Sequence, residues 1–286
     1  MSLLLAPSRF VSRRFATVVL LCLTCVNAKA SVVFNWPNSP GWTAGAPAPG
    51  NTATQSFTSV NPNDITVDVN NNGLSGSGAT WQTNYPQISA SPLTGGLAGV
   101  NGLELYVSSQ TSTSAYIRTT VTFATPVINL SFQIWDVDAV AGQFADKISN
   151  IQALAQGGGI VGATSVTSAT PGYNSITGTG LSTIVLGTAN AANNTNQGTI
   201  NISFSGPITQ FSFDWSNNDP GLGTQAIALG PLTYTPVPEH DSACSVAATC
   251  LIAILGNKLR RRWKIRAEPE DSWKGNAFQS SAINCS

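Results

Sequence analysis

The stretch Thr209–Trp215 reads TQFSFDW, and aromatic side chains alternate there with polar ones. Successive side chains of a β-strand point to opposite faces, so Phe211, Phe213 and Trp215 share one face. The opposite face carries only polar side chains. The stretch therefore predicts a strand with its aromatic face in a core.

The same short alternating runs recur throughout residues 31–236, separated by Gly, Asn and Pro. They are Ile65–Val69, Leu103–Val107, Tyr116–Phe123, Ile128–Trp135, Thr199–Phe204 and Ala226–Tyr234. No capped helical segment of useful length interrupts them, and Ile151–Ala155 is the only ambiguous stretch. Closely spaced strands of this kind predict an all-β fold, an antiparallel, jelly-roll-like β-sandwich.

Charge is distributed very unevenly along the 286 residues, although the formal net charge is zero. Residues 31–238 hold two basic residues, Arg118 and Lys147, against eight acidic ones, a net charge of −6. A nucleic-acid binder needs a basic face on its folded domain, so this composition excludes that class. It also argues against an ordinary cytosolic enzyme.

The first thirty residues have the three parts of a secretory signal peptide. The positive region consists of Arg9, Arg13 and Arg14. The apolar run Phe15–Val26 follows, and it is too short for a comfortable membrane span. Ala28 and Ala30 are the small residues that signal peptidase requires. We therefore expect residues 1–30 to be removed after Ala30, with an uncleaved N-terminal anchor as the alternative.

The C-terminal end also has three parts. Val237, Pro238 and Glu239 come first, and the apolar run Ser242–Gly256 follows. Its 15 residues would form about 22 Å of helix against a hydrocarbon core of about 30 Å. The basic cluster at 258–266 comes last and includes Lys258, Arg260, Arg261 and Arg262. The positive-inside rule predicts that this cluster stops in the cytoplasm and that residues 31–236 lie outside the membrane.

The fixed order of Pro-Glu, short span and arginine cluster resembles the PEP-CTERM sorting signal of Gram-negative bacteria. The resemblance covers residues 237–266; His240 stands where a second proline is usual, and residues 267–286 form an extra tail that we expect to be disordered and cytoplasmic. It implies a transient transmembrane helix in the inner membrane and cleavage near Pro238 by an exosortase-like membrane protease. It further implies a cell-surface or extracellular-matrix protein in an exopolysaccharide or biofilm setting. A plain single-span anchor is the alternative.

From Thr119 onward the body resembles a β-sandwich module of bacterial exported proteins that occurs with interchangeable C-terminal anchors. The matching segments are 121–123 (VTF), 126–132 (PVINLSF), 135–138 (WDVD), 146–148 (DKI), 200–208 (INISFSGPI) and 225–229 (QAIAL). These are mostly structural positions. The resemblance therefore bears on the fold and carries no catalytic residue over.

Cysteine and histidine are both missing from residues 31–238. A disulfide is thereby excluded from this part of the chain, although the exported compartment would permit one. Zinc sites of the usual Cys/His type, cysteine nucleophiles and Ser-His-Asp triads are excluded as well. The core must hold the domain together by packing.

Asp136, Asp138 and Asp146 are the densest acidic group in this charge-poor body. Carboxylate oxygens beside a loop suit Ca²⁺, and Asp219 could add a ligand if its turn folds nearby. The alternative is that these aspartates form turns and keep the surface soluble. A calcium site at Asp136, Asp138 and Asp146 is one hypothesis for this chain, and no other cofactor is expected.

Paired carboxylates also raise the hypothesis of a glycosidase. Glu104 is the only glutamate before the sorting signal, and it sits in the alternating run LELYV. Its position predicts a solvent-facing strand residue, and no second carboxylate can be assigned to it. We therefore expect no catalytic residue.

Four aromatic residues near the N-terminus lie in segments rich in Gly, Pro and Asn: Trp36, Trp42, Trp81 and Tyr85. Exposed aromatic rings hold sugars by stacking, and neighbouring amides add hydrogen bonds. The alternative is ordinary packing, because tryptophan is buried on average.

These patterns favour a non-enzymatic, exported cell-surface or matrix protein. The alternatives are a carbohydrate-binding, lectin-like module with or without calcium and, after that, a glycan-active enzyme.

Overall fold

The computed structural model describes residues 30–61, 64–74, 80–90, 99–108, 112–219, 221 and 223–237. This part of the chain consists of strands and one short 3₁₀ helix, η3 (Gly180–Ser182), so the all-β prediction is confirmed. None of its helices is long and apolar enough to cross a membrane. The predicted signal region before Ala30 and the sorting segment from Pro238 onward lie outside the described residues.

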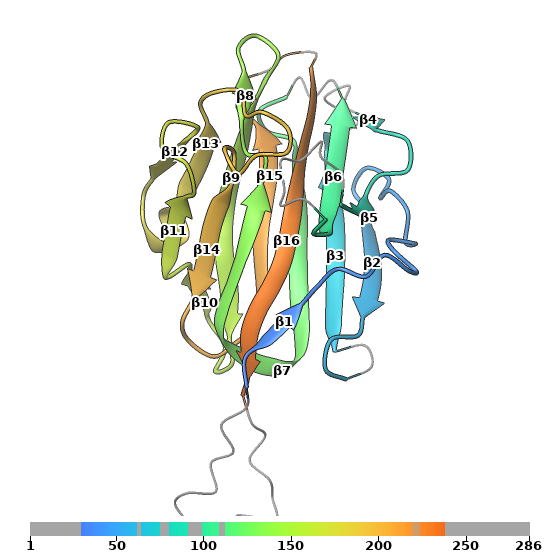
Figure 1. The fold of residues 1–286 in the computed structure, drawn as a ribbon, viewed down its shortest axis with the longest axis vertical. Helices are drawn as coiled ribbons and strands as arrows, with labels where there is room; N and C mark the ends of the chain where they lie inside the picture. Colours follow the sequence, from blue (N-terminus) through green and yellow to red (C-terminus); the bar gives the residue numbers. More distant parts are fainter. Residues whose placement is uncertain are drawn as a thin grey trace, which may run out of the picture. The chain divides into compact units, whose positions relative to one another are not determined.

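The first sheet contains the aromatic stretch Thr209–Trp215, which lies within β15 (Ile208–Asn217; Figure 1). Its strands are antiparallel, in the order β2 (Thr52–Phe57), β3 (Ile65–Asn72), the first half of β7 (Tyr116–Trp135), β15, β9 (Phe144–Ala155), β13 (Ile184–Gly187) and β12 (Asn174–Thr177). Two short strands also pair with β9, namely β8 (Ala139–Val140) and β10 (Ile160–Gly162).

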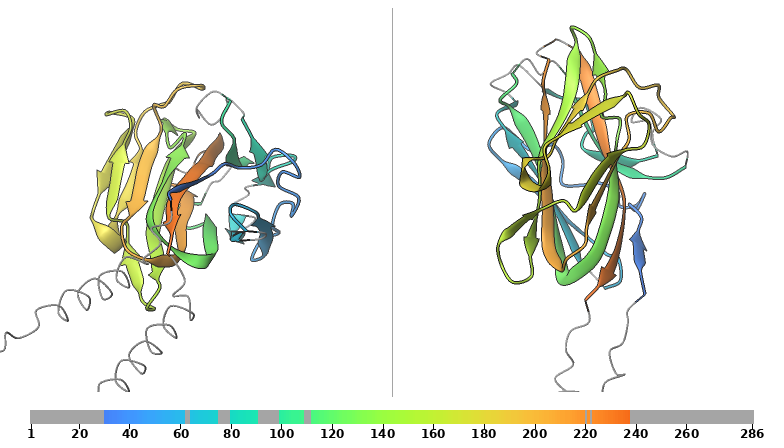
Figure 2. Two further views of the ribbon diagram at one scale, coloured as in Figure 1. Left: turned by 60° about the horizontal axis from the view of Figure 1, so that its bottom comes forward. Right: turned by 90° about the vertical axis from the view of Figure 1, so that its left-hand side faces the viewer.

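The second sheet is built on the other half of β7, and its strands are also antiparallel (Figure 2). Its order is β11 (Ser165–Ser168), β14 (Ile200–Phe204), the second half of β7 and β16 (Thr224–Pro236). The far edge of β16 pairs with β6 (Gly102–Ser108) and with β1 (Val32–Phe34). β6 in turn pairs with β4 (Thr80–Trp81) and β5 (Gln87–Ser89).

Strand β7 belongs to both sheets because its alternation changes phase once. Its buried side chains fall on odd positions from Ile117 to Phe123 and on even positions from Leu130 to Ile134. Opposite β16, the register advances three residues on β7, from Ile128 to Ser131, for two on β16, which is a β-bulge. Asn129 lies in this bulge with φ of 54°. The bulge lets each half of β7 turn its apolar face toward the same interior.

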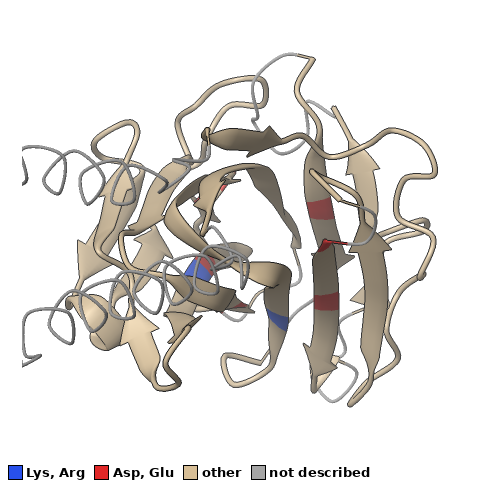
Figure 3. Cartoon of the chain, turned by 90° about the horizontal axis from the view of Figure 1, so that it is seen from below, with Lys and Arg blue, Asp and Glu red and all other residues tan. Residues whose placement is uncertain are grey.

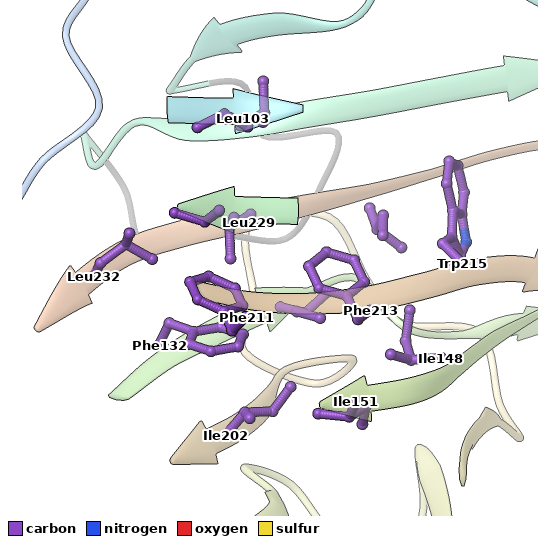
Figure 4. Close-up of a cluster of buried hydrophobic side chains, with 14 of the residues drawn as sticks. Leu103, Phe132, Ile148, Ile151, Ile202, Phe211, Phe213, Trp215, Leu229 and Leu232 are labelled. Atoms are coloured by element: carbon purple, nitrogen blue, oxygen red, sulfur yellow. The ribbon is translucent and has the colours of Figure 1, made fainter. Parts of the chain in front are cut away.

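The interior is closed by aromatic contacts between the two sheets. Phe132 of the second sheet stacks on Phe211 of the first, with ring centroids 4.4 Å apart (Figure 4). Phe123 lies 6.2 Å from Phe211 and 5.1 Å from Tyr234. Phe211, Phe213 and Trp215 are all buried, as their alternation predicts. The two layers with a common apolar core form a sandwich-like arrangement.

The strands predicted from alternation are all present. The runs Tyr116–Phe123 and Ile128–Trp135 are the two halves of one strand, β7, and the ambiguous Ile151–Ala155 is the end of β9. The strands that alternation did not identify are mostly short or peripheral, such as β10 and β12.

Substitution of Asn129 tests the origin of the phase change. Asn129 is exposed, so a change there alters the backbone preference and leaves the core intact. Asn129→Val forces a β-branched residue into the left-handed region, and we expect it to lower the free energy of unfolding by about 1–3 kcal/mol. Asn129→Gly accommodates the same φ and should cost far less. Urea unfolding measures both; equal stability of the two variants would contradict this role.

Candidate functional site

A β-hairpin brings two of the predicted calcium ligands together at one end of the sandwich. β8 and β9 pair Ala139 with Ala145, and the next position of this register places Asp138 opposite Asp146. The Asp146 backbone N–H donates to the Asp138 carbonyl at 2.9 Å. The Asp138 backbone N–H donates to Asp146 Oδ2 at 3.2 Å. Side chains eight residues apart therefore become neighbours.

The protein itself already occupies most of the oxygens of this pair. Trp215 Nε1 donates to Asp146 Oδ1 at 2.7 Å, from the buried face of β15. The Ala191 backbone N–H donates to Asp138 Oδ2 at 2.8 Å. Asp146 is fully buried and Asp138 is 4% exposed. The two carboxyl groups thus accept three N–H hydrogen bonds inside the end of the core.

Asp136 is the third member of the cluster and is held differently. It directly follows β7, has φ of 63° and is 8% exposed. Gly198 packs so closely on it that a Cβ there would lie 2.9 Å from the Asp136 Cα. Asp136 Oδ1 is buried and has no hydrogen-bond partner in the described part of the chain. The structure brings Asp136 near the other two aspartates, close enough that the charge of Asp138 raises the pKa of Asp136 and the charge of Asp136 raises the pKa of Asp146.

Burial makes all three carboxyl groups reluctant to ionise. Burial, and then the charges of Asp138 and Glu104, raise the pKa of Asp136 to about 8. Burial raises the pKa of Asp138 to about 6, opposed by the hydrogen bonds from Ala191 and with Asp146. Burial, and then the charge of Asp138, hold the pKa of Asp146 well above its usual range. The three carboxyl groups therefore favour their protonated, neutral forms.

The geometry does not add support to the calcium hypothesis. In the described residues, no group of three or more His, Cys, Asp or Glu side chains is arranged to hold a metal ion. Asp219 does fold beside the β8–β9 turn, where its Oδ2 accepts the Gly142 backbone N–H at 3.0 Å. That hydrogen bond stabilises the turn, which agrees with the alternative that these aspartates serve to form turns. Calcium at Asp136, Asp138 and Asp146 stays a prediction.

The aromatic residues predicted to contact glycans mainly serve packing. Trp36 is 1% exposed, its Nε1 donates to the Gly230 carbonyl at 2.9 Å, and its ring packs at 5.0 Å from Phe34. The prediction that a sugar could stack on an exposed Trp36 ring is therefore wrong. The ring is buried because β1 pairs with β16 and the ring, which follows β1, also meets Phe57 edge to face at 5.5 Å.

Trp42, Trp81 and Tyr85 are half-buried. The Nε1 groups of Trp42 and Trp81 donate to the carbonyls of Gly45 and Pro47, and both rings pack against the core. The ring of Tyr85 meets the ring of Tyr106 edge to face, with centroids 5.1 Å apart. These contacts favour the packing alternative for all three residues.

Glu104 differs from its predicted solvent-facing position. It is 1% exposed, because β5 pairs with β6 and places Gln87 opposite Glu104. Gln87 Nε2 donates to Glu104 Oε2 at 2.8 Å. The prediction of an exposed strand residue is wrong, since alternation along β6 could not show that β5 lies beside it and places Gln87 next to Glu104.

A hollow of about 360 Å³ lies on the outer face of the second sheet. Polar side chains from four adjacent strands, β11, β14, β7 and β16, line it. They form two rows that cross the strands; the first is Ser165, Ser203, Ser131 and Thr233, and the second begins with Thr167, Asn201 and Gln133. Residues directly opposite one another share a face of the sheet, so these hydroxyl and amide groups all point outward.

Three side chains in the hollow hold one another in fixed orientations. Trp135 Nε1 donates to Gln133 Oε1 at 2.9 Å, and Gln133 Nε2 donates to Asn201 Oδ1 at 2.8 Å. An indole N–H can only donate, so it sets the orientation of the Gln133 amide, and that amide sets the orientation of Asn201. Among the described residues, the Asn201 Nδ2 group and the second Gln133 N–H have no hydrogen-bond partner and can donate to a ligand.

The Trp135 ring is fixed by glycines on the neighbouring strands. A Cβ at Gly102 would lie 2.9 Å from Trp135 Cζ3, and one at Gly230 would lie 2.8 Å from Cζ2. The ring thus lies on the backbones of β6 and β16 and is 2% exposed. Trp135 acts as a support for Gln133 and offers little ring surface for stacking.

Sequence reasoning missed this hollow. Its serines, threonines and amides look like the ordinary polar positions of alternating strands. The available signal was the repetition of polar outward positions in 131–135, 201–203 and 165–167. Using it requires knowledge that β11, β14 and β7 are neighbours, which the chain order does not reveal.

No protein-family model and no curated protein matches the chain. Three solved chains resemble it weakly. The family 11 carbohydrate-binding module of the cellulosomal cellulase Lic26A-Cel5E of Clostridium thermocellum has 12% identity and a TM-score of 0.29, covering 75% of this chain and 99% of that module. A family 11 module from the same organism, in complex with a β-1,3-1,4-mixed-linked tetrasaccharide, has 11% identity and a TM-score of 0.28. The match covers 75% of this chain and 100% of that module.

A structure of carbohydrate-binding modules of the β-sandwich superfamily, described for promiscuous specificity, has 13% identity and a TM-score of 0.26, covering 73% of this chain and 61% of that chain. A likeness at such low TM-scores supports no conclusion about the fold or the ligand of this chain.

The acidic cluster predicts an unusual dependence of stability on pH. The folded pKa of Asp136, about 8, exceeds its ordinary value of 3.8, so the folded state binds more protons than the unfolded state between these values. Stability should fall as pH rises from about 4 through about 8. Asp136→Asn removes the titrating group and tolerates the left-handed backbone, so it should flatten this fall.

Thermal melts of wild type and Asp136→Asn at pH 5 and pH 8.5 measure the effect. At pH 8.5 the variant should melt several degrees higher, since 1 kcal/mol corresponds to about 2–4 °C in a domain of this size. Asp68→Asn, on the outer face of β3, removes one charge away from the cluster and is the control. A steeper fall in the Asp136→Asn variant would contradict the prediction.

Proposed function

We propose that this chain is an exported, non-catalytic β-sandwich protein that binds polysaccharide in the hollow over β11, β14, β7 and β16. The observation that carries the proposal is the pair of outward polar rows around the fixed Trp135–Gln133–Asn201 chain of hydrogen bonds. Because the Gln133 and Asn201 amides are already oriented, a ligand does not have to immobilise them.

The chemistry of the rows fits a sugar polymer. Hydroxyl groups donate and accept hydrogen bonds, and the free amide N–H groups donate, so together they match the hydroxyl-rich edge of a glycan. Adjacent strands lie about 4.8 Å apart, so a row across four strands offers regularly spaced partners over about 14 Å. A repeating chain lying across the strands can contact several of these groups at once.

The lining of the hollow supports a binding role over catalysis. Glycoside hydrolysis usually needs two carboxyl groups beside the scissile bond. The side chains that line the hollow are hydroxyl, amide, apolar and aromatic, with no carboxyl among them. A glycan would be held there without a group to protonate the leaving oxygen.

Export is part of the proposal and rests on the sequence of both ends. Within the described part, β1 begins at Val32 beside the end of β16, where Val32 pairs with Tyr234. The predicted cleavage site at Ala30 and the sorting motif beginning at Val237 thus flank paired strands. This arrangement is compatible with trimming at both ends, since β1 and β16 hold each other in place.

The intact mass of the extracellular protein tests the export half. We expect a chain that begins at Ser31 and ends near Pro238, because signal peptidase and an exosortase-like protease would each cut once. A mass that extends to Ser286 would contradict sorting and favour the single-span anchor.

Loss of the oriented amides tests the binding half. Asn201→Ala should weaken polysaccharide binding about fivefold, the equivalent of one hydrogen bond of about 1 kcal/mol. Gln133→Ala should weaken it further, because it also leaves the Trp135 N–H without its acceptor and frees Asn201. Retention on polysaccharide-containing gels measures the affinities.

Gln210→Ala is the matched control, because this glutamine lies on the outer face of the first sheet and bonds Thr122 Oγ1 at 3.0 Å. It should leave binding unchanged. Equal losses of affinity in Gln133→Ala and Gln210→Ala would argue against the hollow as the binding site. If the wild-type protein binds no polysaccharide, the binding half of the proposal is wrong and an exported matrix protein without a glycan site remains.

A further inference from the structure

The proposed hollow carries no charged side chain, although its walls come from four strands. The side chains that line it are Ser131, Phe132, Gln133, Trp135, Ser165, Thr167, Asn201, Ile202, Ser203, Pro231 and Thr233. A site for uronate, sulfate or phosphate groups usually supplies Arg or Lys, whose charged N–H groups bind anions most strongly. This lining offers only neutral donors and acceptors.

The basic residues of the body are both on the other sheet. Arg118 lies on the outer face of the first half of β7, where its Nε and Nη2 bind Asp214 at 2.6 and 2.8 Å. Lys147 is the half-buried neighbour of the inward-facing Asp146 and Ile148 on β9, so it points to the outer face of the first sheet as well. Neither basic side chain lines the hollow. Figure 3 shows how sparse charged residues are over the strands.

Acidic groups lie closer to the hollow than basic ones do. Glu104 shares the cross-strand row of Ala228 and Trp135, two strands from Trp135 on the same face. Asp136 follows Trp135 directly in the chain. The formal net charge over residues 31–238 is −6, and it would still be −3 with Asp136, Asp138 and Asp146 protonated, so the field around the domain repels polyanions.

We infer that the ligand of the hollow is an uncharged polysaccharide and that acidic polysaccharides are excluded. This inference rests on the proposed function and narrows its ligand class. Under this inference the chain differs from matrix proteins that bind polyanions through basic patches. It recognises its ligand through hydrogen bonds of hydroxyl and amide groups alone.

Gel retention of the purified full chain against two sets of polymers tests the inference. The neutral set is a soluble β-glucan, a galactomannan and dextran; the acidic set is alginate, polygalacturonate and hyaluronate. Each is measured at about 0.01 M and about 0.15 M salt, where the screening length is about 30 Å and about 8 Å. We expect at least one neutral polymer to retard the protein at both salt concentrations and no acidic polymer to do so at either.

A variant with an added positive charge tests the same inference through a gain of binding to an acidic polymer. Thr167 is exposed on β11 beside Asn201, so Thr167→Lys adds a cation to the hollow without disturbing the core. It should gain retention by alginate at low salt and lose it at high salt. Thr120→Lys, the same change on the outer face of the first sheet, is the control and should gain less.

The outcomes separate the two proposals. Retention by an acidic polymer that exceeds retention by every neutral one would overturn the inference while leaving the proposed function intact. Retention by neither set would overturn the proposed function itself. An alginate gain that is equal in Thr167→Lys and Thr120→Lys would also contradict the inference, because it would show that charge acts through the whole domain.

Discussion

The bulge at Asn129 in β7 is the constraint on which the rest of the structure depends. One strand of twenty residues contributes to both sheets only if its apolar face changes side partway along. The odd positions before the bulge and the even positions after it then face the same interior, where Phe132 can stack on Phe211. Without the bulge, a period of two would turn one half of the core outward.

The same phase change determines what the protein presents to solvent. Because Phe132 and Ile134 point inward, Ser131, Gln133 and Trp135 must point outward from the second sheet. Pairing with β14 and β16 then aligns Asn201, Ser203 and Thr233 beside them. The candidate binding face is thus a direct consequence of the packing of the core.

Alternation was sufficient to predict β7, β15 and β16 and the buried face of Phe211, Phe213 and Trp215, but it did not identify the twelve-residue β9. Closeness in sequence, and not alternation, grouped Asp136, Asp138 and Asp146, and the β8–β9 hairpin joins two of them. Alternation could not show which strands are neighbours, so the burial of Glu104 beside Gln87 of β5 and the polar rows over β11 and β14 were missed. For Trp36 the sequence left sugar stacking and packing open, and only the fold shows that its ring packs on Phe34 and Phe57 while its N–H donates to the Gly230 carbonyl.

The most direct test of the account is a map of backbone and side-chain NMR shifts on addition of a neutral oligosaccharide that the protein binds. We predict shifts at the Gln133 and Asn201 side-chain amides and at the Trp135 indole N–H. Little change is expected on the first sheet at Arg118 or at Asn150 of β9, whose Nδ2 donates to Asp214 Oδ2 at 2.6 Å. Shifts centred on Arg118, or on Trp42 and Tyr85, would contradict the assignment of the hollow as the binding site.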